Sequence, residues 1–117
     1  MKILPDPIEF EWDKGNTDKN FKKHNVTNKE TENVFLDEDT IVFEDFKHSQ
    51  QEKRHGMFGK TSKGRYLAIV FTVRINKIRI ITARDMSKKE RSAYEKKNSK
   101  QSQNLKVKMR NAISGQQ

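Results

Sequence analysis

Apolar residues concentrate in residues 65–84, where the segments RYLAIVFTVR and KIRIITAR flank Ile75 and Asn76. Runs rich in Val, Ile, Phe and Tyr on both sides of a two-residue connection are typical of a β-hairpin. Because only 32% of the chain is hydrophobic, the core has to be built on this hairpin. We therefore expect the other elements to pack against it.

Alternation along the hairpin divides its side chains between two faces. With the turn at Ile75 and Asn76, the expected pairs are Arg74 with Lys77, Thr72 with Arg79, and Leu67 with Arg84. One face then holds the apolar side chains that helices must cover: Leu67, Ile69, Phe71, Val73, Ile78 and Ile80. The opposite face offers an open groove of small and basic side chains: Tyr66, Ala68, Val70, Thr72, Arg74, Arg79, Ile81 and Ala83. A bulge would exchange these assignments.

The acidic N-terminal part predicts a strand followed by two helices. Residues 8–12 (IEFEW) alternate apolar and acidic side chains, which is typical of a half-buried strand with Ile8, Phe10 and Trp12 on one face. Asp13 can cap a polar helix that runs to about His24. A second helix starts at the capping-box pair Thr27 and Glu30 and buries one stripe. That stripe comprises Thr31, Val34 and Phe35.

Two more strands and a third helix complete the pattern. Residues 41–43 (IVF) predict a strand. Residues 54–61 predict an edge strand, or one kinked or bulged for close approach of a neighbour, because the segment contains two glycines. Ser87 and Glu90 form another capping-box pair, which starts a helix that runs to about Asn98.

These elements predict one α+β domain over residues 1–98, with a twisted antiparallel β-sheet and helices packed mainly on one face. Residues 99–117 form a basic polar tail that we expect to be disordered or ordered by a partner. The chain has no apolar run long enough to span a bilayer and no signal-peptide pattern.

Charge is segregated along the chain. Residues 1–46 carry 6 basic and 12 acidic side chains, residues 47–86 carry 10 and 2, and residues 87–117 carry 9 and 2. This pattern favours a polyanion partner, most simply RNA or DNA, although a highly soluble basic protein has the same composition. The absence of cysteine and the unpaired spacing of three histidines predict neither a metal site nor a cofactor.

The order of several motifs resembles the BrnT family of bacterial type II toxins. The motifs are FEWD (10–13), KHNVT (23–27), HSQQEKR (48–54), and IRIITAR followed by KKERSAYE (78–95). The resemblance covers roughly residues 8–96. It implies a RelE-like ribonuclease toxin of the bacterial cytoplasm, which arrests growth by cleaving RNA. It also implies a BrnA-type antitoxin whose ribbon-helix-helix domain binds operator DNA.

The chain departs from the family at two positions near the hairpin. The turn at Ile75 and Asn76 stands where the family usually has a glycine-containing turn. Asp85 stands where the family usually has a basic residue. An acid beside a phosphate site would weaken RNA binding or change its pH dependence.

Metal-independent RNA cleavage needs a base for the 2′-hydroxyl proton, positive charge on the phosphorane and an acid for the 5′-oxygen. The candidates for catalysis are Glu52, Arg84, Arg79, Tyr94 and His48. The candidates for RNA binding are Arg54, His55, Arg74, Lys53 and Lys88. No candidate stands out for a metal.

Arg84 is the strongest candidate, because it follows a strand, adjoins a helix N-terminus and has a permanently charged fork suited to phosphate. Glu52 is expected to act as general base or to orient an arginine. Tyr94 would stack on a base or donate a proton. The two histidines His48 and His55 would transfer protons.

Each candidate also has an ordinary structural reading. Glu52 and Arg84 can form surface ion pairs, the latter with Asp85 or Glu90, and Tyr94 can be a packing residue. We interpret His24 as a helix C-terminal residue rather than a catalyst. A non-catalytic nucleic-acid-binding module and a protein-interaction domain therefore remain alternatives to the enzyme. We expect the acidic N-terminal part to form the structural side and an antitoxin surface.

Overall fold

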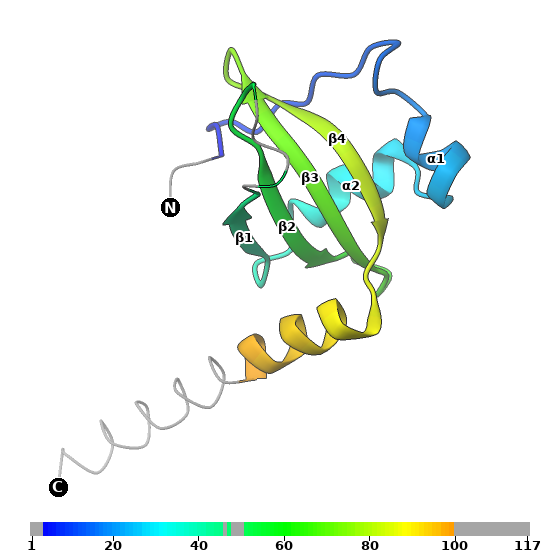
Figure 1. Cartoon of the computed structure of the whole chain (residues 1–117), viewed down its shortest axis with the longest axis vertical. Helices are drawn as coiled ribbons and strands as arrows, with labels where there is room; N and C mark the ends of the chain where they lie inside the picture. Colours follow the sequence, from blue (N-terminus) through cyan, green and yellow to red (C-terminus); the bar gives the residue numbers. More distant parts are fainter. Residues whose placement is uncertain (1–3, 46, 48–50, 100–117) are drawn as a thin grey trace, which may run out of the picture.

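The computed structural model describes residues 4–45, 47 and 51–99 (Figure 1). The elements are α1 (Lys19–His24), α2 (Asn28–Val34), β1 (Ile41–Glu44), β2 (His55–Lys60), β3 (Tyr66–Arg74) and β4 (Lys77–Asp85). Residues 88–99 form a further helix. Of the predicted tail, residues 99–117, all but the first residue lie outside the described residues.

The strands form one antiparallel sheet in the order β1-β2-β3-β4. Figure 1 shows α2 crossing behind the strands, α1 beside the edge formed by β4, and the helix of residues 88–99 beyond the end of β4. The sheet and its helices confirm the α+β prediction. None of the described helices is long and apolar enough to cross a membrane.

The core lies between the hairpin β3–β4 and α2, as the hydrophobic pattern predicts. Phe35, at the end of α2, stands edge-on to Phe71 of β3 with ring centroids 5.4 Å apart. It also stands edge-on to Phe10, at 5.0 Å. The fully buried members of this core include Val26, Val34, Leu67, Ile78, Ile80 and Ala83. Burial of this apolar surface supplies the main driving force for folding.

A β-bulge in β4 changes the faces that strict alternation predicts. Arg74 pairs with Lys77 and Thr72 with Arg79, as expected, but the register shifts between Val70 and Phe71. Phe71 lies opposite Ile80 and Val70 opposite Thr82, so Ile81 is the extra residue.

The prediction that Leu67 pairs with Arg84 is therefore wrong, because Ala68 takes that position. Because of the extra residue, the Ala83 side chain points into the core, where it is fully buried, and not to the predicted open groove. The extra residue also places Arg84 on the same face as Arg79, which the ideal register separated. We call this side, which carries Val70, Thr82 and Arg84, the open face.

The N-terminal segment differs from its prediction. Only Phe10 forms a β-bridge, parallel to Ile78, so the expected strand is reduced to one bridge with two backbone hydrogen bonds on the outer edge of β4. The first helix begins at Lys19 rather than after Asp13. The Asp13 carboxylate instead accepts a hydrogen bond from the backbone N–H of Gly15 at 2.8 Å, which makes a turn.

Both predicted capping boxes are confirmed. Glu30 N donates to Thr27 Oγ1 at 3.1 Å, and Thr27 N donates to Glu30 Oε1 at 3.0 Å. Ser87 N donates to Glu90 Oε1 at 2.8 Å, and Glu90 N donates to Ser87 Oγ at 3.2 Å. These local bonds fix where α2 and the helix of residues 88–99 begin.

The strand β2 lies between β1 and β3, so its prediction as an edge strand is wrong. The alternative was a strand kinked or bulged for close approach of a neighbour: the close approach is present, but β2 pairs with both neighbours without a register shift. A Cβ atom at Gly59 would lie 2.5 Å from Val34 Cγ1. The glycine therefore allows α2 to pack directly on the backbone of β2.

The hairpin turn contains a strained residue. Ile75 (φ 49°) and Asn76 (φ 60°) both adopt left-handed conformations, which suit asparagine but disfavour a β-branched side chain. The Ile75 side chain is 95% exposed, so it adds little to the core.

We predict that Ile75→Asn raises the free energy of unfolding by about 1 kcal/mol, because it relieves the left-handed strain. Urea denaturation should show a higher midpoint at an unchanged m-value. The control Ile75→Thr stays β-branched and should keep a midpoint near that of the wild type. An equal gain from both variants would rule out backbone strain as the cause.

Candidate functional site

A hollow of about 460 Å³ lies on the open face of the sheet. Small side chains of the inner strands form its floor, among them Gly56, Ala68 and Val70. Its rim includes Phe43, Phe58, Thr82, Arg84, Glu90, Asp45 and His24. The hollow thus brings a guanidinium, an imidazole, carboxylates and aromatic rings to one surface.

Arg84 is fixed at this rim by the start of the following helix. Its Nη1 and Nη2 donate to the two carboxylate oxygens of Glu90 at 2.6 and 2.8 Å. This pairing raises the pKa of Arg84 and lowers the pKa of Glu90 to about 2, so both are charged at neutral pH. The Arg84 side chain remains 44% exposed, and the exposed Lys88 lies in the first turn of the helix. The guanidinium is therefore oriented and still reachable by a phosphate.

His24, the last residue of α1, lines the same hollow. Arg65 holds this end of α1 against the sheet, because its guanidinium donates to the carbonyl of Asn25 at 2.8 Å and to the carbonyl of His24 at 3.3 Å. The sequence predicts that His24 ends a helix, but it does not predict that His24 lines the same hollow as Arg84. The motif KHNVT was the only signal in the sequence that pointed to it.

Asp85, the unusual acid after Arg84, is bound on the other side of β4. Its carboxylate accepts from Arg65 Nε at 2.7 Å and from Arg65 Nη2 at 3.1 Å. The Arg65 guanidinium lowers the pKa of Asp85. Asp85 pairs with Leu67, on the opposite face of β4 from Arg84, and the Arg65 guanidinium compensates its charge.

Glu52 and Arg74 form a separate cluster at the tip of the hairpin. Arg74 donates to both carboxylate oxygens of Glu52, at 2.9 and 2.6 Å, and this lowers the pKa of Glu52. Arg74 lies six residues along β3 from Ala68, the partner of Arg84, which corresponds to roughly 20 Å. The geometry agrees with the prediction that Glu52 orients an arginine, here Arg74. Glu52 lies far from Arg84.

Arg79 fastens the N-terminal segment to β4. Its Nη1 donates to Glu11 Oε1 at 2.9 Å and to Asp13 Oδ2 at 2.7 Å, and its side chain is only 13% exposed. It shares the open face with Arg84 but lies about 13 Å along the strand, outside the lining of the hollow. The structure therefore places both arginines on one face without joining them in one hollow.

Two other candidates are packed inside the protein. Tyr94 is 4% exposed, and its hydroxyl donates to Asp37 Oδ2 at 2.7 Å. Burial and this bond raise the pKa of Tyr94. His55 lies on the core side of β2, with its ring 5.4 Å from that of Phe71, and burial lowers its pKa. Both positions favour structural roles.

The remaining candidates lie near the start of β2. Lys53 is exposed and its Nζ lies 3.9 Å from Glu44 Oε1. The carbonyl of Arg54 accepts from Asp45 N at 2.9 Å, which extends the pairing of β1 with β2. His48 lies outside the described residues. In the part of the chain that the structure describes, no group of three or more His, Asp or Glu side chains is arranged to hold a metal ion.

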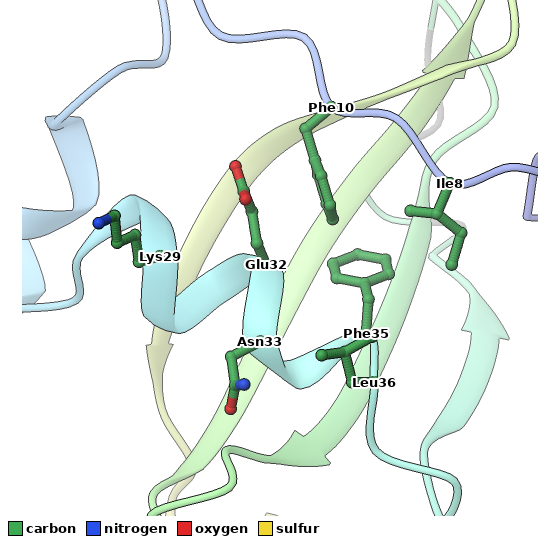
Figure 2. Close-up of a pocket in the computed structure, with 7 residues that line it drawn as sticks. All are labelled: Ile8, Phe10, Lys29, Glu32, Asn33, Phe35 and Leu36. Carbon is green, nitrogen blue, oxygen red and sulfur yellow. The ribbon is translucent and has the colours of Figure 1, made fainter.

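A second hollow, of about 430 Å³, lies on the helical side of the protein (Figure 2). Figure 2 shows Phe10 and Phe35 at its centre, with Ile8 and Leu36 beside them. Leu36 is 76% exposed and Ile8 is 39% exposed. An exposed leucine beside a hollow lined by aromatic rings is typical of a surface that binds a protein partner.

A protein-family model matches most of the chain. A family model described as "Ribonuclease toxin, BrnT, of type II toxin-antitoxin system" matches residues 12–90. A search of curated proteins finds no significant match. The matched range includes His24, Arg84 and Glu90, the charged or titratable residues on the β4 side of the open-face hollow.

We predict that the Arg84–Glu90 pair makes stability depend on pH in the acidic range. The folded state holds Glu90 ionised down to a pKa of about 2, against 4.5 without its partners. Its contribution is therefore complete above pH 5 and is lost as pH falls toward 2.

Glu90→Gln should lower the free energy of unfolding at pH 7 by on the order of 1 kcal/mol. Denaturation at a series of pH values should show this gap closing as the pH falls from 5 to about 2. In an Arg84→Gln background the same substitution should have little effect. A gap that stays constant over this range would contradict the assigned pairing.

Proposed function

Because the chain belongs to the BrnT family of ribonuclease toxins of type II toxin–antitoxin systems, we propose that it cleaves RNA without a metal ion in the hollow of its open face. The family has an RNA substrate and a cognate antitoxin. The proposal adds the place of cleavage, the groups that perform it and the surface that the antitoxin covers.

One observation carries the proposal: Arg84 and His24 line the same hollow. Arg84 binds the scissile phosphate and stabilises the negative charge that develops on its oxygens. His24 takes the proton of the 2′-hydroxyl. The 2′-oxygen attacks phosphorus, the bond to the 5′-oxygen breaks, and the leaving oxygen takes a proton from solvent. The products are a 2′,3′-cyclic phosphate and a 5′-hydroxyl.

Glu90 acts in this scheme by positioning Arg84. Its low pKa makes it a poor base at neutral pH, and both of its oxygens face the Arg84 guanidinium. Lys88, in the same first turn of the helix, contacts a neighbouring phosphate. Basic side chains near the hairpin tip contact flanking phosphates: Lys53, Arg54, Arg74 and, to a smaller extent, Arg79. Glu52 orients Arg74.

We predict that the purified protein cleaves single-stranded RNA in the presence of EDTA and that Arg84→Ala lowers kcat/KM by about 100- to 1,000-fold. The matched control is Arg91→Ala, because Arg91 also pairs with a glutamate, Glu95, at 3.3 Å on the exposed side of the same helix. This control should retain wild-type cleavage. Circular dichroism verifies that both variants are folded.

The same assay tests His24. His24→Ala should lower kcat by about 100-fold or more with little change in RNA affinity. Binding of RNA without cleavage by the wild type would favour a non-catalytic RNA-binding module. Loss of cleavage in EDTA with recovery on adding Mg²⁺ would contradict the metal-independent mechanism.

We further propose that the antitoxin, of the BrnA type, binds the hollow in Figure 2. The hollow lies on the N-terminal part of the chain, where residues 1–46 carry 12 acidic and 6 basic side chains. This charge repels RNA and complements a basic partner. Leu36 and Ile8 supply exposed apolar surface for the apolar side chains of an antitoxin segment.

We predict that Leu36→Glu weakens the complex with the antitoxin by at least about tenfold, because it places a charge in an apolar contact. The measurement is calorimetric titration of a cleavage-deficient Arg84→Ala protein with the antitoxin. Ile75→Glu, at an exposed apolar side chain on the hairpin turn, is the matched control. Equal affinity of both variants would exclude this surface.

A further inference from the structure

The open face carries an exposed aromatic ring that the cleavage mechanism does not use. Phe43 of β1 lies on the open face of the sheet and is 39% exposed. Its ring meets the ring of Phe58 edge-on, with centroids 5.1 Å apart and an angle of 67° between the planes. The two rings form the β1 side of the hollow.

Gly56 makes this arrangement possible. A Cβ atom at Gly56 would lie 2.2 Å from Cε2 of Phe43, so any other residue would push the ring away from the sheet. The glycine lets the ring lie directly against the backbone of β2. Phe43 is therefore held in place on the sheet side while part of its surface stays open to solvent.

The register places the rings and Arg84 on opposite sides of one hollow. Phe43 pairs with Gly56, and Gly56 pairs with Val70, while Phe58 pairs with Ala68 in the neighbouring row. Ala68 pairs in turn with Arg84. Three strand spacings separate β1 from β4, which corresponds to about 14 Å. A chain that crosses the strands can therefore touch Phe43 and Arg84 at once, over a floor of small side chains.

We propose that Phe43, supported by Phe58, is a stacking platform for an unpaired base of the RNA substrate. This inference rests on the proposed cleavage at Arg84. An exposed aromatic ring on a sheet next to a phosphate-binding arginine has the chemistry of single-strand recognition, because every base has a π-face that stacks on such a ring. A base inside a duplex is already stacked on its neighbours and cannot use the platform.

The substrate is accordingly single-stranded RNA that lies across the four strands of the sheet. One nucleotide presents its phosphate to Arg84 and His24, while a base elsewhere in the same strand stacks on Phe43. Gly56, Ala68 and Val70 leave room for the sugar-phosphate chain between these two points. The platform thus favours loops and unpaired segments over helical RNA.

The test compares Phe43→Ala, Phe43→Trp and Phe21→Ala. Phe21 is the matched control, because its ring is 46% exposed and lies on α1, outside the lining of the hollow. The probe is a fluorescent single-stranded oligonucleotide with 2′-O-methyl groups, which cannot be cleaved through the 2′-oxygen. Its affinity is measured by anisotropy, and cleavage of the matching RNA gives kcat and KM.

We expect Phe43→Ala to weaken probe binding and raise KM by about tenfold, with kcat changed less than twofold, which is typical of one lost stacking contact. Phe43→Trp should bind at least as tightly as the wild type, and Phe21→Ala should match it. If the wild type cleaves RNA but Phe43→Ala keeps its affinity and KM, the platform is refuted and the cleavage proposal stands.

If the wild type binds the probe through Phe43 but cleaves no RNA, the cleavage proposal fails and the platform stands. Weaker binding of the antitoxin to Phe43→Ala, with unchanged binding of the oligonucleotide, would assign the ring to a protein contact and overturn the inference.

Discussion

The bulge at Ile81 is the constraint on which the rest of the structure depends. An extra residue in β4 reverses the faces of all residues that follow it. Before the bulge, Ile78 and Ile80 point into the core and Arg79 points to the open face. After it, Ala83 points into the core and Arg84 points to the open face. Without the extra residue, Arg84 would be directed at the helices and the hollow would lose its cation.

Arginine–carboxylate pairs then hold the peripheral segments to this hairpin. Arg79 binds Asp13 and Glu11 of the N-terminal segment, Arg65 joins Glu30 and Asp85, and Arg84 binds Glu90. Much of the positive charge on these side chains is therefore compensated within the protein. An RNA phosphate that binds Arg84 has to compete with Glu90, whereas the exposed Lys88 offers charge nearby. Recognition at the proposed site would consequently depend on geometry and stacking as well as on net charge.

Local sequence signals predict local structure well. The capping boxes at Thr27 and Ser87 and the turn at Ile75 and Asn76 depend on neighbouring residues, and all three are present. The bulge, the inner position of β2 and the reduction of residues 8–12 to one bridge depend on tertiary packing, which one sequence does not reveal. The same limit applies to the site. The sequence makes Arg84 a candidate through its strand end, the adjoining helix N-terminus and the family motif. The proximity of His24 depends instead on how Arg65 fastens α1 to the sheet.

The central claim is that the open face of the sheet, rather than its helical side, receives RNA. Backbone amide chemical shifts during titration with an uncleavable 2′-O-methyl oligonucleotide test it most directly. We expect the largest changes at Phe43, Gly56, Val70, Thr82 and Arg84, which line the hollow, and small changes around Phe35 and Leu36. Changes concentrated at α2 and the N-terminal segment, with the open face undisturbed, would contradict the account.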